Sequence, residues 1–144
     1  MNKITVNASK TYEIVIGAGL LSEAGRFARE TVGGLAAGII MDDTVAELYG
    51  KPLTDSLVSN GYRTAVHVFP HGEESKNADT FLSVLNFFAA EGLSRTDMVV
   101  ALGGGVTGDL AGFAAACYMR GSGLYRYPRP CSLWWILLLG GRLP

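Results

Sequence analysis

Apolar and polar positions alternate with two different periods along the chain, and the changes of period predict strands and helices in turn. Residues 2–7 and 12–16 alternate every second position, which predicts two strands joined by a polar turn at residues 8–10. Residues 20–30 carry apolar side chains at helical spacing, and the apolar run 35–41 predicts a buried strand. The chain therefore opens with a hairpin and continues into a strand that follows a helix.

The same alternation continues through the rest of the chain to about residue 120. The further predicted elements are helices at 45–49 and 52–59, a strand at 62–69, a helix at 78–91, a strand at 98–102 and a helix after it. Asn77 is the expected N-cap of the helix at 78–91, and Gly92 is the expected stop. Strands that alternate with helices predict an α/β domain with a Rossmann-like, mostly parallel sheet.

The glycine-rich stretch after the last of these strands is the strongest chemical signal. Gly103–Gly105 lack Cβ atoms where the backbone turns into a helix, and a helix start presents free N–H groups and positive dipole charge. An anionic group, most simply a phosphate, is predicted to bind there. Gly103, Gly105 and Gly108 also fit the spacing G-x-G-x-x-G, but no acid follows Asp109 to hold a ribose, so a standard Rossmann site fails on that count. The alternative is a turn that serves only helix–sheet packing.

Polar loops follow three of the predicted strands, and ligands of parallel sheets bind at the carboxyl ends of strands. The loops are residues 42–44, 71–76 and 103–109. Asp42 is a candidate acceptor for ribose hydroxyls, and Lys76 is a candidate to neutralise a phosphate that the glycine turn binds. The other interpretation is that Asp42 and Asp109 favour helix N-termini and that Lys76 is a solvated lysine.

Composition narrows the class of protein. The 144 residues include 49% apolar ones and carry a net charge of −1, which fits one domain with a core and argues against a nucleic-acid surface or a membrane anchor. Cys117 and Cys131 make no disulfide framework, and the N-terminus has no apolar signal core, so a reduced, cytoplasmic protein is expected. His67 is expected to be structural. His71 lies in a candidate loop, but a single histidine there is only weak evidence for a catalytic role. No cluster of side chains has metal-ligand spacing.

Three segments together resemble the N-terminal, NAD-binding part of 3-dehydroquinate synthases. They are Pro70–Lys76, Ala101–Ala115 and Tyr118–Gly121, of which the second is the longest and most specific. The resemblance implies NAD as a cofactor, contacted by Asp42, Thr44, Glu73, Lys76, Gly104, Gly105, Val106 and Asp109. Thr44 stands where the family often has Asn, and it still offers a hydroxyl. Arg120 matches an arginine that the family uses on the substrate phosphate from a neighbouring subunit, which implies a homodimer.

The resemblance also implies a reaction. The family converts a sugar acid phosphate, 3-deoxy-D-arabino-heptulosonate 7-phosphate, to 3-dehydroquinate in the shikimate pathway of aromatic amino acid biosynthesis. Bound NAD transiently oxidises a hydroxyl, which acidifies the adjacent C–H for phosphate elimination, and ring closure follows. A divalent metal, zinc or cobalt, polarises the reacting hydroxyls, and its ligands lie in a helical C-terminal domain that is absent here. Another sugar-phosphate cyclase, a metal-dependent polyol dehydrogenase and a non-catalytic nucleotide-binding fragment stay open as alternatives.

The family pattern ends near Gly121, so residues 1–121 are expected to be a partial, truncated NAD-binding α/β domain that is inactive alone. Residues 122–144 contain no acid but two adjacent tryptophans, and we expect a non-native, frameshifted tail that forms no packed element. A shift by one base turns Trp134-Trp135 into valine and Trp135-Ile136 into aspartate, with no freedom in either codon. Both fall within a run, Met-Val-Asp-Ser-Ser-Val-Gly-Gly-Lys, that the family has next.

Overall fold

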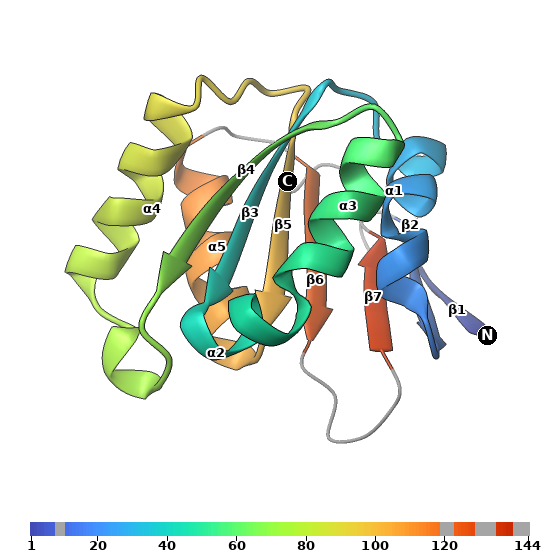
Figure 1. Cartoon of the computed structure of the whole chain (residues 1–144), viewed down its shortest axis with the longest axis horizontal. Helices are drawn as coiled ribbons and strands as arrows, with labels where there is room; N and C mark the ends of the chain where they lie inside the picture. The colour runs from blue at the N-terminus through green and yellow to red at the C-terminus, as the bar shows by residue number, and fades with distance from the viewer. Residues whose placement is uncertain (8–10, 119–122, 129–134, 140–144) are drawn as a thin grey trace.

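The computed structural model describes residues 1–7, 11–118, 123–128 and 135–139, which form one sheet with helices on both faces (Figure 1). In chain order the elements are β1 (Asn2–Asn7), β2 (Thr11–Gly17), α1 (Leu20–Thr31), β3 (Ala36–Asp42), α2 (Asp43–Val45), the π-helical turn η1 (Ala46–Gly50), α3 (Lys51–Ser59), β4 (Arg63–Phe69), the 3₁₀ turn η2 (Glu73–Ser75), α4 (Ala78–Ala90), β5 (Met98–Gly103), α5 (Gly105–Tyr118), β6 (Gly123–Pro128) and β7 (Trp135–Leu139).

The strands lie in the order β1-β2-β7-β6-β5-β3-β4. The four strands β6, β5, β3 and β4 are parallel to their neighbours in this order. β7 is antiparallel to both strands beside it, and β1 pairs with β2 as the expected hairpin. The α/β fold predicted from the sequence is confirmed, and its parallel half is the part that carries the candidate site.

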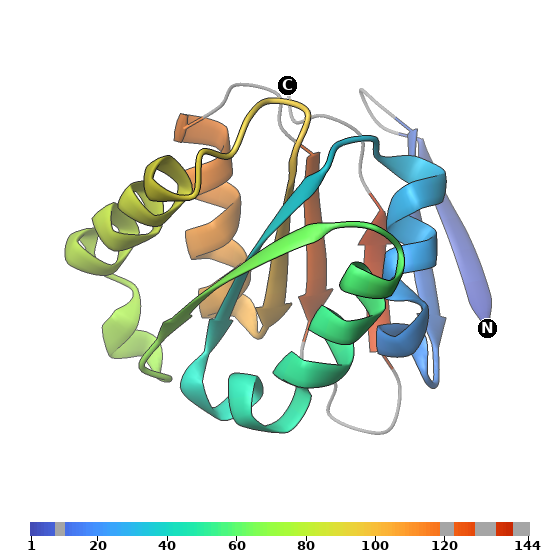
Figure 2. The same cartoon turned by 45° about the horizontal axis from the view of Figure 1, so that its top comes forward.

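Helices cover the two faces of the sheet in pairs. α1 and α3 lie on one face, and α4 and α5 lie on the other (Figure 2). Side chains of the central strands alternate between the two apolar clusters, so that Ile39 and Val100 pack towards α1 and α3 while Ile40 and Ala101 pack towards α4 and α5. Burial on both faces explains why these strands are continuously apolar in the sequence.

A glycine lets the two helices on the first face approach closely. A Cβ on Gly25 of α1 would overlap the backbone carbonyl of Ser56 in α3, so no larger residue fits. The Ser56 hydroxyl accepts a hydrogen bond from the Gly25 N–H at 3.0 Å and donates one to the Ser22 carbonyl at 2.8 Å. These bonds satisfy the polar groups of a buried serine at the crossing.

The region between β3 and β4 differs from the sequence-based expectation. Two separate helices were expected, whereas α2, η1 and α3 form one helical stretch from Asp43 to Ser59. Pro52 has no N–H to donate and lies in the first turn of α3. The π-helical turn that precedes it widens the helix, which offers a physical reason why the stretch continues through a proline instead of breaking.

Two segments of the C-terminal tail form strands. Residues 123–128 are β6, which continues the parallel half beside β5, and residues 135–139 are β7, which joins β6 to the hairpin. The expectation that residues 122–144 form no packed element is therefore wrong for these two segments. Strand pairing gains backbone hydrogen bonds from almost any apolar sequence, so it does not test whether the tail is native, and the frameshift stays a prediction.

Candidate functional site

The three polar loops predicted from the sequence lie at one edge of the sheet. Asp42 pairs with Phe69 across β3 and β4, and Met41 pairs with Leu102 across β3 and β5, so the carboxyl ends of the three strands are level. Residues 42–44, 71–76 and 103–109 follow these ends at the lower edge of the view in Figure 1. We call these three loops the carboxyl-end ledge.

Asp42 lies at the start of the helical stretch that follows β3. Its Oδ1 accepts a hydrogen bond from the Val45 N–H at 2.8 Å, so the carboxylate is the N-cap of α2. This is the helix-terminus role that the sequence left open. Capping uses one oxygen of a half-buried carboxylate, and the chemistry of the group allows the other oxygen to accept from a ligand.

Glu73, Lys76 and Asp109 come together on the ledge. The Lys76 ammonium lies 2.9 Å from Oδ2 of Asp109 and 3.8 Å from Oε1 of Glu73. The hydrogen bond to Asp109 raises the pKa of Lys76, and the nearby Glu73 charge adds to the effect. The lysine is half exposed and fully charged at neutral pH, and it already has an acidic partner from α5, which the sequence did not predict.

The three adjacent glycines have different surroundings. A Cβ on Gly103 would overlap the Oγ1 of Thr107, a residue that is 1% exposed, so this glycine serves packing. Cβ atoms on Gly104 and Gly105 would meet no atom of the described residues within 4 Å, and neither glycine has a positive φ. The first N–H groups of α5, including that of Val106, have no acceptor inside their own helix. The packing interpretation of the turn is therefore correct for Gly103, and phosphate binding at Gly104 and Gly105 stays a prediction.

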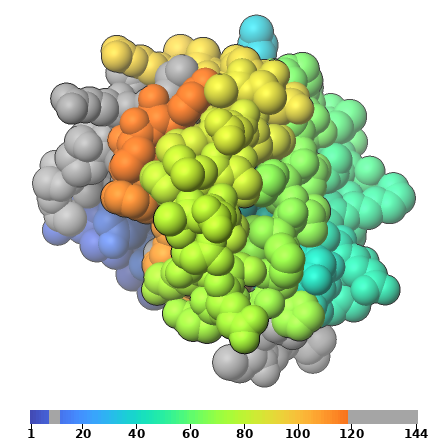
Figure 3. Space-filling view, turned by 90° about the vertical axis from the view of Figure 1, so that its left-hand side faces the viewer, coloured from blue at the N-terminus to red at the C-terminus, as the bar shows by residue number. Residues whose placement is uncertain are grey.

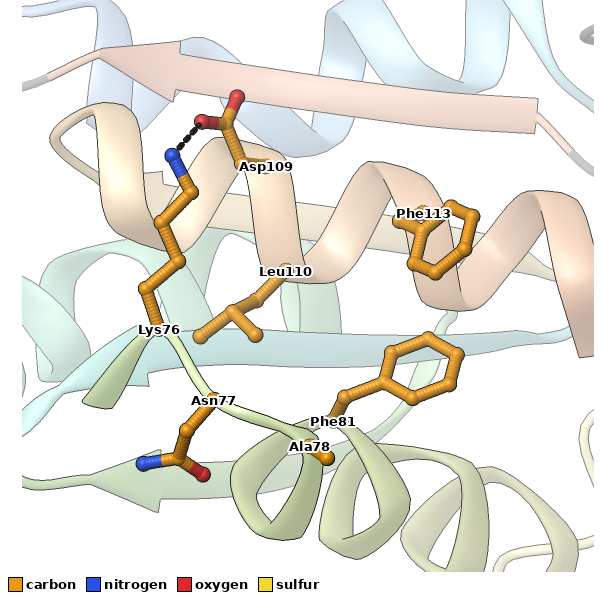
Figure 4. A pocket seen from close by; sticks show the side chains of 7 residues that line it. All are labelled: Lys76, Asn77, Ala78, Phe81, Asp109, Leu110 and Phe113. Atoms are coloured by element: carbon orange, nitrogen blue, oxygen red, sulfur yellow. Dashed lines mark ion pairs between the residues drawn. The ribbon is translucent and has the colours of Figure 1, made fainter. Parts of the chain in front are cut away.

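A groove of about 490 Å³ runs between the amino-terminal parts of α4 and α5. Figure 3 looks onto these two helices, and Figure 4 shows that Lys76 and Asp109 lie at one end of the groove while two phenylalanines face each other at the other. The rings of Phe81 and Phe113 are stacked with centroids 4.9 Å apart, and Phe113 is 62% exposed. The sequence analysis did not find this groove, because the two phenylalanines are 32 residues apart (113 minus 81).

The two histidines have different roles. His67 hydrogen-bonds Ser83 at 3.1 Å and packs beside Phe87, and burial lowers the pKa of its imidazole. It is structural, as expected. His71 contacts Asp43 across two loops of the ledge, with Nδ1 2.7 Å from the carboxylate. That pair was missed, although the adjacency of parallel strands was a signal that could have revealed it.

The remaining sequence-based candidates are resolved only in part. Arg120 and Cys131 lie outside the described residues, whereas Cys117 is a free, exposed thiol. Thr44 is half-buried, and its hydroxyl is 3.5 Å from Oδ1 of Asp43. Over residues 1–7, 11–118, 123–128 and 135–139, no group of three or more His, Cys, Asp and Glu side chains is arranged to hold a metal ion. In the same part of the chain, no helix is long and apolar enough to cross a membrane.

Solved structures with this fold define the class. The fold is similar to that of 2-deoxy-scyllo-inosose synthase complexed with carbaglucose-6-phosphate, NAD⁺ and Co²⁺, with a TM-score of 0.77, 24% identity, and coverage of 88% of this chain and 35% of that chain. It is also similar to 2-epi-5-epi-valiolone synthase from Streptomyces hygroscopicus subsp. jinggangensis 5008 with NAD⁺ and Zn²⁺ bound, with a TM-score of 0.65, 28% identity, and coverage of 80% and 31%. The described chain has the fold of the corresponding part of sugar-phosphate cyclases.

Sequence comparison points to one family within this class. The family described as 3-dehydroquinate synthase N-terminal matches residues 66–133. A 3-dehydroquinate synthase of Streptococcus suis (strain 05ZYH33) is 43% identical over 127 residues, which are 88% of this chain and 36% of the relative. The chain is similar to 3-dehydroquinate synthases over most of its own length, so the resemblance seen in three sequence segments is confirmed. It spans about a third of the length of the curated relatives that it matches.

Proposed function

We propose that this chain is the NAD-binding part of a 3-dehydroquinate synthase. The observation that carries the proposal is the carboxyl-end ledge, where three loops with the family's candidate residues meet beside open backbone at Gly104 and Gly105. The whole enzyme would convert 3-deoxy-D-arabino-heptulosonate 7-phosphate to 3-dehydroquinate. We propose further that it does so in the cytoplasm, in the shikimate pathway, and as a homodimer in which Arg120 reaches the phosphate of the neighbouring subunit's substrate.

The described residues fit a dinucleotide with two phosphates. Gly104, Gly105 and Val106 would give a phosphate access to backbone N–H groups at the positive end of α5, because no described side chain lies within 4 Å of where Cβ atoms of the two glycines would be. Asp42 and Thr44 would hold ribose hydroxyls, and Glu73 and Asp109 would accept from other donors of the cofactor. NAD, when bound, supplies reversible hydride transfer, and the protein supplies orientation and charge.

Lys76 needs a change of partner before it can neutralise a phosphate. Its ammonium is held by Asp109 in an exposed pair, and exposed ion pairs contribute little to stability. A doubly charged pyrophosphate at the nearby glycine turn would compete well for the lysine. The Asp109 carboxylate would then exchange its contact with Lys76 for one with the cofactor.

The family's divalent metal does not fit the residues described here. No described cluster could hold it, and no step of the reaction is assigned to it on this chain. We propose that a separate C-terminal domain provides the metal ligands, and that the 144-residue chain binds NAD without catalysing phosphate elimination.

Titration calorimetry of the purified chain with NAD, combined with a phosphate-release assay, tests both statements. We expect NAD binding without zinc-dependent phosphate release from the substrate. Asp42→Asn is the most informative variant, because the amide oxygen of the new side chain can still cap α2 while the negative charge is lost. It should weaken NAD binding about tenfold, as expected for the loss of a charge-assisted hydrogen bond. Unchanged affinity in a folded Asp42→Asn protein would remove Asp42 from the site, and turnover by the chain alone would disprove its inactivity.

A further inference from the structure

One carboxylate oxygen joins two loops of the ledge. Oδ1 of Asp43 accepts hydrogen bonds from the backbone N–H of His71 at 3.0 Å and from the N–H of Thr44 at 2.8 Å. Nδ1 of the His71 imidazole lies 2.7 Å from the same oxygen. The carboxylate therefore holds the loop after β4 to the turn after β3, one residue beyond the last backbone pair of these strands.

The chemistry of the pair defines where the proton lies. The hydrogen bond from His71 lowers the pKa of the Asp43 carboxyl, so the group is ionised at neutral pH and can only accept hydrogen bonds. Nδ1 of the imidazole, 2.7 Å away, must therefore carry the proton and donate it to the carboxylate.

The pair lies between residues that are candidates for binding. Asp43 separates Asp42 from Thr44, and His71 precedes Glu73 and Lys76 in the same loop. Gly72, between His71 and Glu73, has a φ of 107°, a conformation that other residues rarely adopt. A contact that fixes His71 therefore restrains the residues that follow, because only the turn at Gly72 separates them.

Among the described residues, polar contacts join this loop to three neighbouring elements. One is the Asp43–His71 contact on the β3 side, and another is the Lys76–Asp109 ion pair on the α5 side. The third is at the start of α4, where the Asn77 side chain donates a hydrogen bond to the Glu74 carbonyl at 2.7 Å. If Lys76 exchanges Asp109 for a phosphate, the contact on the α5 side is lost when the ligand arrives, and the contact on the β3 side remains.

We propose that Asp43 and His71 are a positioning pair, which keeps the loop from Pro70 to Lys76 in place while Lys76 changes partner from Asp109 to a phosphate of NAD. This role rests on the proposed function, but the pair's effect on the loop can be measured without NAD. His71 and Asp43 act through Lys76 and are not themselves required to touch the cofactor.

Amide hydrogen exchange across residues 72–76 of the 144-residue chain, without NAD, is the first measurement. Asp43→Ala removes both bonds to His71 and should speed exchange there about fivefold, the upper end for one exposed ion pair. His71→Ala keeps its backbone N–H bond and should show a smaller effect, and His71→Gln, which can donate to Asp43, should restore protection. Asp55→Ala breaks a similarly exposed ion pair, with Lys51 in α3, and is the matched control.

The second measurement is NAD affinity of the same variants, with the ¹⁵N signals of the His71 ring as a signature. We expect affinity to fall in the same order as protection, and the Nδ1–H form of the neutral ring to be lost in Asp43→Ala. Loop exchange in Asp43→Ala equal to that of Asp55→Ala would overturn the positioning role. If the unmutated chain does not bind NAD, the proposed function fails, whereas the exchange data still decide what the pair does to the loop.

Discussion

At the scale of single residues, adjacent glycines of the turn have different roles: one allows close packing, and the next leaves room for a ligand. Gly103 is required because Thr107 fills the space where its side chain would be. Gly104 lacks a positive φ, and no described atom lies within 4 Å of where its Cβ would be, so neither its backbone nor its described neighbours require glycine there. Only the need to leave room for a ligand then argues for glycine at position 104.

These surroundings predict opposite results for two substitutions. Gly103→Ala should destabilise the fold by about 1–3 kcal/mol through overpacking against Thr107. Gly104→Val should change stability by less than about 1 kcal/mol, the cost of a poorer N-terminal residue for α5, but should severely weaken NAD binding. Denaturant unfolding and calorimetry on the same preparations measure both. Full NAD affinity in a folded Gly104→Val protein would refute the assignment of the turn.

At the scale of elements, Asp97 joins the start of β3 to the turn before β5. The residue is 9% exposed, and its carboxylate accepts hydrogen bonds from the N–H groups of Leu35 and Ala36 and from the N–H and hydroxyl of Ser94. Burial alone would raise the pKa of Asp97, but the hydrogen bonds outweigh it and the pKa is lowered. One side chain thus fixes the amino ends of two central strands.

The lowered pKa gives this contact a pH dependence of known sign. A carboxyl with a depressed folded-state pKa stabilises the fold above its unfolded value, near 3.8, and loses that contribution as pH falls through the folded value. Asp97→Asn should therefore cost about 2 kcal/mol at pH 7 and less at pH 3, because charge-assisted hydrogen bonds are replaced by weaker ones. Urea unfolding at both pH values checks this. An equal loss at both would mean that the charge has no part in the effect.

The elements also show which structural information the sequence contained. Asn77 does cap α4 through its side chain, and the strand at 98–103 is buried throughout, because caps and apolar runs are local signals. The sequence did not reveal the Asp43–His71 pair or the stacked Phe81 and Phe113. These contacts depend on which strands and helices become neighbours, and on how far individual side chains reach.

At the scale of the whole molecule, the sheet has two halves that meet at β7. Among the described residues, this strand pairs with β2 over five residue pairs and with β6 over two. The family match extends to residue 133, past residue 121 where we expected the family pattern to end.

We propose that residues 122–144 are read from a shifted frame. The expected result is that the encoding DNA, read one base over, contains GTG and GAT under Trp134-Trp135-Ile136 within codons for Met-Val-Asp-Ser-Ser-Val-Gly-Gly-Lys. In that case the side chains of β7 were not shaped by natural selection. Sequencing the gene across this segment is the measurement. Shifted codons that do not give this run would show that the tail is native and that the account is wrong.

The parallel pairing of β4, β3 and β5 also dictates when the ledge can arise as the chain folds. Its loops follow three successive strands, and the connection from β4 must cross β3 to place β5 on the side of β3 away from β4. Such long-range closures cost chain entropy before they return any contact energy, which makes parallel sheets slow to form. A partly folded chain therefore has its loops but not their arrangement, and a ligand of the ledge would recognise only molecules that have completed folding.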